Sequence, residues 1–373
     1  MKFTFDRDAM IKEISIAQEI ISTKNVGSIL SNVLLSAHNN ALTIKATDIK
    51  VNFETHIPFQ VEEEGSTTVY CDKFMGILNS LPDGEIEFNQ SSEGDDQGVT
   101  VVIKPVAKKI KFQMKSMSQE KFPDFDAAEN VPYFEVPSKD IKEMISQTSF
   151  AVSEDETRYF MNGVYFEKKG SNLILVATDG RRLSYASKNI LDGVSDFPSA
   201  IVHPKILTTI LKHSPSEGNI SIAVVEKMIF FRFGNYKFGS VLLEGQFPNY
   251  ERVIPENQAY SFQVNKNDLI NALKRVALMV DKKAGRLFFN ISDGILKITS
   301  QVSEMGSADE EIPCEYAGQP YSLALNYRYV EEPLRVIQAE RIKFEFTEEM
   351  KAVTLKPEPA EDYFHIIMPM QKE

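Results

Sequence analysis

The chain contains 373 residues, of which 43% are hydrophobic and 25% are charged, and its formal net charge is −12. This length exceeds one ordinary domain, and three domains of about 125 residues would each have a common size. The acidic balance argues against a protein that holds nucleic acid by attraction over its whole surface, because each phosphate contact needs a lysine or an arginine. A local basic face is still compatible with this charge.

Signals for targeting and for cysteine chemistry are few. No uninterrupted apolar run reaches the roughly 18 residues of a membrane span, and the N-terminus leads into no signal-peptide core. The two cysteines, Cys71 and Cys314, lie far apart, which argues against a disulfide framework or a zinc site. We therefore expect a cytosolic protein with no membrane partner and with both cysteines reduced.

The first third of the chain opens with a strand, because Phe3 and Phe5 alternate with polar residues. Apolar residues three and four apart then predict a helix over residues 6–22. An alternating apolar run over residues 42–48 predicts another strand, which closes on Ala-Thr-Asp. A second helix is predicted over residues 72–80.

The same order of elements recurs twice, so the chain consists of three repeats. The Ala-Thr-Asp ending is identical in the second copy and is only partly kept in the third. The corresponding strands and helices are 134–136, 138–149, 173–179 and 204–213 in the second copy, and 262–264, 266–280, 296–300 and 327–338 in the third.

Two matching phrases mark the ends of the first and second repeats. Phe122-Pro123-Asp124-Phe125 and Phe247-Pro248-Asn249-Tyr250 each contain a proline that a central strand or helix cannot accommodate. They predict domains over residues 1–127, 128–251 and 252–373. Each domain has two amphipathic helices among short alternating strands, which is typical of an α+β fold with the helices on one side of an antiparallel sheet.

The residues of an enzyme active site are missing. The five histidines share no ligand spacing, and no glycine-rich nucleotide loop occurs. The pair Asp179-Gly180 is far more typical of a tight turn after a strand than of a catalytic acid. We therefore predict no catalytic residue, no metal site and no cofactor.

Three repeats can form an open arc, or they can close into a ring of six domains by pairing head to tail with a second chain. An apolar strand protected by lysines and an apolar helix offer two surfaces for closure. Periodicity alone favours the alternative that both surfaces line their own domain cores. The apolar residues concerned are Ile110, Phe112 and Met114 on the strand, and Leu273, Val276, Leu278 and Met279 on the helix.

Four segments together resemble those of the bacterial DNA sliding clamps, the beta subunits of the replicative DNA polymerase III holoenzyme. These segments are residues 158–163, 177–183, 247–253 and 366–370. The resemblance covers all three repeats and implies the DNA clamp fold, in which a head-to-tail homodimer forms a six-domain ring. It implies a non-catalytic processivity factor that encircles duplex DNA. A negative body with a mildly positive lining would let such a ring slide.

The resemblance also implies a partner pocket between the second and third repeats. Such a pocket would receive a short peptide carrying leucine and phenylalanine, because methionine is pliable enough to fit many partners. The alternative is that the C-terminal Met-Pro-Met merely ends a core strand. The implied pocket residues are Met161, Thr178, Gly180, Arg181, Arg182, Leu183, Pro248, Arg252, Val253, Ile366, Ile367, Met368, Pro369 and Met370.

Contacts with DNA and between chains follow from the same resemblance. Solvated surface charge is the alternative for each DNA-binding lysine. Glu154, Asp155 and Glu156 crowd Arg158, and Asp72 adjoins Lys73, so these acids should weaken the phosphate contacts. The implied DNA-binding residues are Lys24, Lys73, Arg158, Tyr159, Phe160 and Lys205. The implied dimer interface contains Phe112, Met114, Leu273, Leu278 and Met279.

The implied partners are double-stranded DNA of any sequence, the catalytic subunit of the replicative polymerase, an ATP-driven clamp loader, and a second copy of the chain. Other polymerases and repair proteins with leucine- and phenylalanine-containing peptides would use the same pocket. The protein would be cytoplasmic and associated with the nucleoid at replication forks. From the residues alone, two other functions stay open, namely a scaffold that binds peptides but not DNA, and an unrecognised hydrolase.

Overall fold

The computed structural model describes residues 1–21, 27–58, 60–92, 99–125, 128, 130–281, 283–348 and 350–371. The chain forms two compact units, which are described separately. Unit 1 comprises Met1–Glu135, Lys212–Pro215 and Asn219–Val241. Unit 2 comprises Val136–Leu211, Ser216–Gly218 and Leu242–Glu373.

All six predicted helices are confirmed. Three of them begin at side-chain caps: the Asp6 carboxylate accepts the N–H of Ala9, Asn265 accepts from Asn267 and Asp268, and Asn326 accepts from Arg328. The helices within the described residues are α1 (Arg7–Ile20), α2 (Cys71–Ser80), α3 (Ser138–Thr148), α4 (Pro204–His213), α5 (Lys266–Val276) and α6 (Tyr327–Val336).

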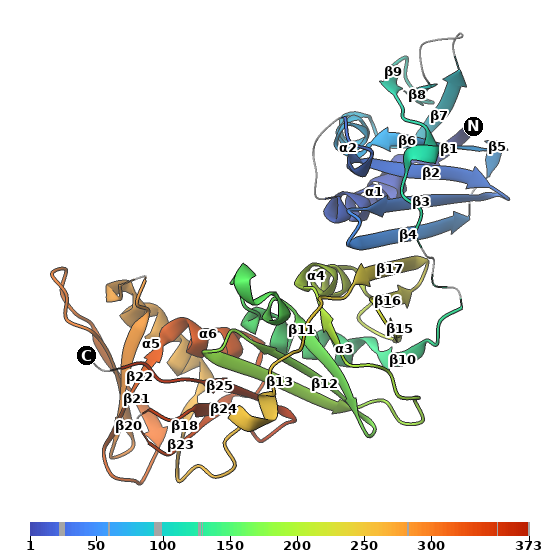
Figure 1. The fold of residues 1–373 in the computed structure, drawn as a ribbon. Coiled ribbons are helices and arrows are strands. Elements are labelled where there is room, and N and C mark those ends of the chain that lie inside the picture. The colour runs from blue at the N-terminus through green and yellow to red at the C-terminus, as the bar shows by residue number, and fades with distance from the viewer. Residues whose placement is uncertain are drawn as a thin grey trace. The chain divides into compact units, whose positions relative to one another are not determined.

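Unit 1 contains two sheets. The five-stranded sheet has the order β5-β1-β7-β8-β9, and the eight-stranded sheet has the order β10-β15-β16-β17-β4-β3-β2-β6. Helices α1 and α2 pack against each other beside them (Figure 1). The strands are β1 (Lys2–Asp6), β2 (Asn32–His38), β3 (Ala41–Thr47), β4 (Val51–Pro58), β5 (Val61–Glu63), β6 (Gly65–Tyr70), β7 (Glu85–Ser92), β8 (Val99–Pro105), β9 (Phe112–Lys115), β10 (Phe134–Pro137), β15 (Asn219–Val225), β16 (Met228–Phe233) and β17 (Tyr236–Val241).

Unit 2 is built on one sheet of twelve strands with the order β14-β11-β12-β13-β25-β24-β23-β18-β21-β20-β19-β22. Helix α6 packs against both α3 and α5. The strands are β11 (Val164–Lys169), β12 (Asn172–Thr178), β13 (Arg182–Asn189), β14 (Ala200–Val202), β18 (Tyr260–Asn265), β19 (Arg286–Ser292), β20 (Ile295–Ser300), β21 (Asp309–Glu315), β22 (Tyr321–Asn326), β23 (Arg341–Phe346), β24 (Val353–Glu358) and β25 (Tyr363–Ile367).

The repeated phrases of the sequence form equivalent elements. The three alternating runs are strands β3, β12 and β20, and the opening strands β1, β10 and β18 each lead directly into a helix. Strand pairing also crosses from one repeat to the next, because β17 pairs with β4 and β13 pairs with β25, both antiparallel. The two compact units therefore do not coincide with single repeats.

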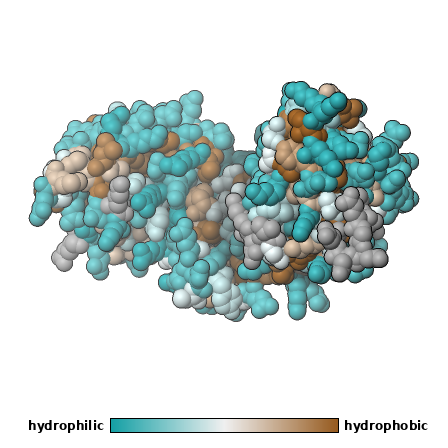
Figure 2. Space-filling view, turned by 90° about the horizontal axis from the view of Figure 1, so that it is seen from above, coloured by the Kyte–Doolittle hydropathy of each residue, from teal (hydrophilic) through white to brown (hydrophobic). Residues whose placement is uncertain are grey.

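Stacked aromatic rings lie in the cores of both units. In unit 1 the Phe3 and Phe88 rings stack with centroids 4.7 Å apart. In unit 2 Phe262 and Phe344 stack with centroids 4.6 Å apart. Figure 2 shows a face on which hydrophilic residues predominate and hydrophobic residues are interspersed. Among the described residues, no helix combines the length and the apolar character needed to cross a membrane.

The two surfaces predicted for ring closure differ in how far their residues are buried in the single chain. Strand β9 lies at a sheet edge, as predicted, with Phe112 and Met114 half-buried. On α5, however, Leu273 is only 1% exposed and belongs to the core of its own unit, so its assignment to the dimer interface is wrong. Leu278 lies in the 3₁₀ turn after α5 and is 78% exposed.

Candidate functional site

The turn between β12 and β13 is shaped by Asp179. Its carboxylate Oδ1 accepts the backbone N–H groups of Arg181 at 2.9 Å and Arg182 at 3.0 Å. Gly180 has a φ of 85°, which glycine adopts without strain. The Thr178 hydroxyl donates to the carbonyl of Arg182 at 2.6 Å and closes the turn. These contacts confirm Asp179-Gly180 as a tight turn.

The Arg182 side chain joins this turn to α6. Its Nε donates to the Asp179 carboxylate at 3.0 Å, and its Nη2 donates to the carbonyl of Phe150 at 2.8 Å. The guanidinium forms an ion pair with Glu332 of α6 and lies 4.5 Å from the centre of the Tyr329 ring. With 9% of the side chain exposed, Arg182 is fully engaged inside the protein.

The C-terminal segment forms the opposite wall. Strand β25 pairs with β13, so that Ile366 lies opposite Leu183. The N–H of Met368 donates to the carbonyl of Arg181 at 2.8 Å, and the N–H of Met370 donates to the carbonyl of Ala324 at 2.8 Å. The segment is therefore fixed by main-chain bonds on both sides of Pro369.

Between these walls lies a cavity of about 260 Å³, here called the Leu183 pocket. Its floor belongs to an apolar cluster that includes Leu183, Tyr250 and Ile366. The Tyr250 hydroxyl donates to Glu167 at 2.6 Å, which orients the ring. The lining residues are Met161, Thr178, Gly180, Arg181, Arg182, Leu183, Pro248, Asn249, Tyr250, Val253, Ile366 and Met368.

The structure brings together all the predicted pocket residues except four. Ile367 is 0% exposed, because alternation along β25 turns it to the face opposite Ile366, so its assignment to the pocket is wrong. Arg252, Pro369 and Met370 are also outside the lining of the cavity. Met370 instead holds the C-terminal segment on β22 through its backbone.

Three residues at this site were missed. Asn249 and Tyr250 line the pocket and belong to the Phe-Pro-Asn-Tyr phrase, of which only Pro248 was assigned to the pocket. His365 lies behind the pocket wall, 0% exposed, with its ring centre 5.5 Å from that of Phe150. Burial lowers the pKa of His365 to about 3, and the nearby Arg182 charge acts in the same direction. Alternation along the terminal strand could have placed His365 inside.

The residues predicted to contact DNA lie at several places. In unit 2, Arg158 and Tyr159 are exposed in a 3₁₀ segment, Phe160 is half-buried, and Lys205 is half-buried on α4. In unit 1, Lys73 is exposed on α2. Lys24 lies outside the described residues.

Of the acidic residues predicted to crowd the DNA contacts, Asp155 contacts Arg158 in the structure. Asp155 forms an ion pair with Arg158, with an N–O distance of 3.2 Å. Asp72 accepts a hydrogen bond from Gln18 at 2.6 Å. One nitrogen of Arg158 would stand 3.3 Å from a Cβ added to Gly180, so this guanidinium lies next to a residue of the pocket lining.

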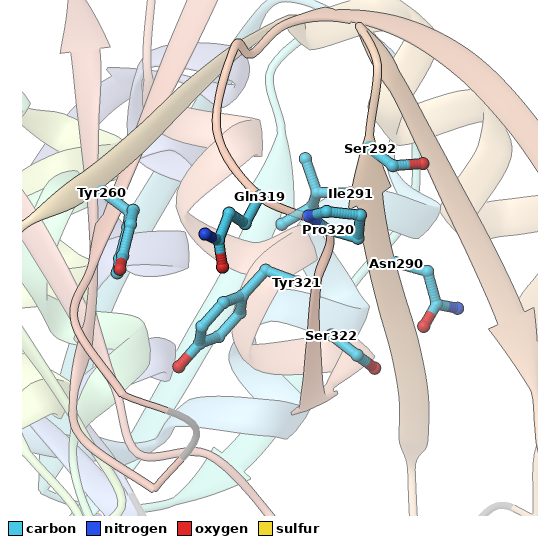
Figure 3. A pocket seen from close by; sticks show the side chains of 8 residues that line it. All are labelled: Tyr260, Asn290, Ile291, Ser292, Gln319, Pro320, Tyr321 and Ser322. Carbon is cyan, nitrogen blue, oxygen red and sulfur yellow. The ribbon is translucent and has the colours of Figure 1, made fainter.

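Two larger cavities contain none of the predicted site residues. One, of about 470 Å³, lies between strands of the third repeat and has mainly polar and aromatic walls formed by Tyr260, Asn290, Ile291, Ser292, Gln319, Pro320, Tyr321 and Ser322 (Figure 3). The other, of about 430 Å³, contains Lys188, whose pKa is raised by the carboxylates of Glu143 and Asp140. Within the described part of the chain, no group of three or more residues could hold a metal ion.

Comparisons with known proteins agree along the whole chain. Family models of the DNA polymerase III beta subunit match residues 1–126 as its N-terminal domain, 135–249 as its central domain and 251–371 as its C-terminal domain. The beta sliding clamp of Treponema pallidum is 47% identical over 377 residues, and that of Escherichia coli is 26% identical over 372 residues. Each alignment covers 100% of both chains.

Solved structures show the same fold. The DNA polymerase III subunit beta of Pseudomonas aeruginosa has a TM-score of 0.91 and 27% identity, with 100% of both chains covered. The beta sliding clamp of Caulobacter crescentus has a TM-score of 0.93 and 27% identity, with 100% of this chain and 99% of that chain covered. The chain therefore belongs to the DNA polymerase III beta subunit family, the bacterial sliding clamps, and its role is that of a non-catalytic processivity factor.

Proposed function

We propose that the Leu183 pocket tethers the replicative DNA polymerase by holding a short peptide of its catalytic subunit. The observation that supports this most strongly is the cavity itself, which is apolar, open to solvent and lined by the two methionines Met161 and Met368. Burying one leucine or phenylalanine anchor contributes about 1.5 to 3 kcal/mol. Two anchors give moderate affinity, which suits a tether that raises the local concentration of its partner.

The pocket assignment can be tested by substituting an exposed lining residue, which leaves the packing of the core unchanged. Val253 lines the pocket and is 51% exposed, so Val253→Glu places a charge against the peptide without filling the interior. Val241→Glu is the matched control, because Val241 is 39% exposed and does not line the pocket. We expect at least a tenfold loss of affinity for a leucine- and phenylalanine-containing peptide in the first variant only. Equal affinity in both variants would overturn the pocket assignment.

We also propose that two copies close head to tail into a six-domain ring with repeats over residues 1–127, 128–251 and 252–373. Two strand edges support this closure. Exposed lysines Lys108, Lys109, Lys111 and Lys115 line β9 and the segment before it. Strand β21 carries Asp309, Glu310 and Glu311, which pair with β20. Within the described residues, β21 pairs with β18 only through Cys314 and Glu315. The side of these acidic residues that faces away from β20 is free to pair with the edge strand β9 of a second chain. Their ion pairs with Lys297 and Arg275 would persist or exchange with the lysines of β9.

The apolar part of this joint would lie beside the charged edges. Phe112 and Met114 are half-buried on β9, and Leu278 and Met279 follow α5. Leu278 at 78% exposure is a large apolar side chain in contact with water in the single chain. Covering it with a second chain removes that contact, which contributes up to about 2 kcal/mol.

Inside such a ring, double-stranded DNA of any sequence is held by enclosure. Lys73, Arg158, Tyr159, Phe160 and Lys205, together with Lys24, supply weak contacts that permit sliding. The partners are the polymerase, an ATP-driven loader that opens the ring, and other polymerases and repair proteins that share the Leu183 pocket. The protein works in the cytoplasm on the nucleoid, at replication forks.

A further inference from the structure

We infer that the cavity of about 470 Å³ in the third repeat is a second binding site, which takes an uncharged, proline-rich segment of a partner protein. The inference goes beyond the proposed function of the Leu183 pocket, because the two cavities share no lining residue. The cavity is here called the Tyr260 groove, after the more exposed of its two tyrosines. Its size is that of an ordinary ligand site.

The lining of the Tyr260 groove favours an uncharged ligand. None of its eight residues carries a charge, so the groove offers no cation to a phosphate or a carboxylate, and no carboxylate to a metal ion or a lysine. Two tyrosines, a proline and an isoleucine provide apolar surface, while an asparagine, a glutamine and two serines provide polar groups. The matching ligand combines apolar rings with neutral hydrogen-bonding groups.

The two tyrosines of the groove are held in fixed positions. The ring centres of Tyr260 and Tyr321 lie 5.8 Å apart, with the ring planes inclined by 36°. The buried Phe346 supports both rings, with its centre 5.7 Å from that of Tyr260 and 4.7 Å from that of Tyr321. The Tyr321 hydroxyl donates to the carbonyl of Thr347 at 3.3 Å. A proline ring can pack against these faces with little loss of side-chain freedom in the groove.

The free polar groups of the groove supply hydrogen-bond donors. The hydroxyls of Tyr260, Ser292 and Ser322 and the amide of Gln319 form no hydrogen bond with the described part of the chain. Proline has no N–H, so a proline-rich segment offers carbonyl oxygens as acceptors and few main-chain donors. Unpaired hydroxyl and amide groups therefore complement such a segment.

A main-chain donor at the groove is also directed outward. Strand β22 lies at the edge of the twelve-stranded sheet, and the carbonyl of Ala324 accepts from Met370 of the C-terminal segment. Since alternate residues of a strand direct their backbone groups to the same side, the N–H of Ser322 also faces away from β19. The C-terminal segment continues away from it, because the carbonyl of Gln371 accepts from Arg286 at the other end of β22.

The arrangement of the lining favours an extended ligand. Figure 3 shows side chains in two groups that point to opposite sides of the strands, namely Tyr260, Gln319 and Tyr321 in one group and Asn290, Ser292 and Ser322 in the other. A compact ligand would contact only one group, whereas an extended chain that passes Pro320 contacts both. Proline-rich segments adopt the extended polyproline II conformation before they bind, which lowers the entropy lost on binding.

The test measures binding of fluorescein-labelled decaproline to the full chain by fluorescence polarisation. Decaproline should bind roughly tenfold more tightly than a labelled peptide of ten alternating glycines and serines, which lacks both the rings and the preformed conformation. Tyr260→Phe removes only a free hydroxyl and should lower the affinity about threefold. Gln319→Glu replaces the amide donor by an acceptor of the same size and should lower it about fivefold or more.

Two controls show where decaproline binds. Gln60→Glu makes the same charge change at an exposed site in unit 1 and should leave the affinity unchanged. A saturating peptide with leucine and phenylalanine, directed to the Leu183 pocket, should not displace decaproline. Equal affinity for the two labelled peptides, displacement by the leucine- and phenylalanine-containing peptide, or unchanged affinity in both groove variants would overturn the inference.

Discussion

Arg182 has a structural role that its position in the sequence does not reveal. Its guanidinium connects the Asp179 turn to Glu332 and Tyr329 of α6, and these partners lie far away along the chain. The resemblance to sliding clamps assigned both Arg181 and Arg182 to the pocket. Their different surroundings depend on tertiary packing, which no local pattern encodes.

Arg182→Ala should lower the free energy of unfolding by about 2 kcal/mol, because Glu332 and Asp179 lose their shared partner in a partly buried site. Arg181→Ala, one residue away and exposed, should change the free energy of unfolding by less than about 0.5 kcal/mol. Chemical denaturation of both variants measures the difference, and similar values for the two would contradict the structural role of Arg182.

His365 predicts how stability depends on pH. Its pKa is about 3 in the folded chain, compared with 6.5 for an ordinary histidine, so the unfolded chain takes up the proton more readily. The contribution of this group is fully present above pH 6.5 and is lost as the pH falls. Between pH 6.5 and 4.5 we expect the free energy of unfolding to fall by about 1 kcal/mol per pH unit.

The variant His365→Phe isolates this effect, because it removes the titrating group while keeping a ring against Phe150. Its free energy of unfolding should fall less steeply over the same pH range, whatever its absolute stability. Denaturation curves at several pH values provide the measurement. Parallel slopes for the two proteins would show that another group is responsible.

At the scale of elements, periodicity predicted all six helices and the repeated strands. It failed at the end of α5, where the predicted helix continued to residue 280 but the structure has a 3₁₀ turn from Ala277 to Met279. Leu278 extends the apolar pattern and yet is exposed. A pattern of apolar residues cannot distinguish a face buried in the core of its own chain from a face that a second chain would cover.

The C-terminal segment shows a second limit of predicting the pocket residues from the sequence. Resemblance placed the whole run from Ile366 to Met370 in the pocket, whereas strand alternation removes Ile367 and main-chain pairing directs Met370 to β22. The prediction was right about the segment and too broad about its residues. The geometry of a strand end decides which residues of the run face the cavity.

Deleting residues 368–373 should abolish stimulation of the polymerase, because Met368 forms one wall of the Leu183 pocket. Peptide affinity should fall at least tenfold, the effect of losing one apolar contact surface. The dimer should persist. Deleting residues 371–373 is the control, since it leaves Met368 and the Met370 bond to Ala324 in place. Full stimulation by the longer deletion would refute the pocket assignment.

At the scale of the whole molecule, the repeats and the compact units divide the chain differently. Sequence similarity identified three repeats, but pairing of β17 with β4 and of β13 with β25 merges the middle repeat into both units. In unit 1, Glu54 of β4 contacts Lys237 of β17 at 3.3 Å across this pairing. Such contacts join residues remote in sequence, so repeat detection alone could not predict them.

Leu278→Asp should open the proposed ring, because an unpaired charge in an apolar joint is costly. The single chain should still fold, since Leu278 is 78% exposed in it. Ile49→Asp is the control, as Ile49 is 64% exposed in unit 1 and belongs to neither proposed surface. Light scattering should give about 42 kDa for the first variant and twice that mass for the second. A dimer in both would place the joint elsewhere.

We propose that the protein holds DNA by surrounding it. The most direct measurement is to load the chain onto nicked circular duplex with a bacterial clamp loader and ATP, isolate the complex by gel filtration, and then cut the circle once. We predict that the protein stays with the closed circle and separates from the DNA after the cut, because only a ring can slide off an end. Retention on the linear product, or no retention on the circle, would contradict encirclement.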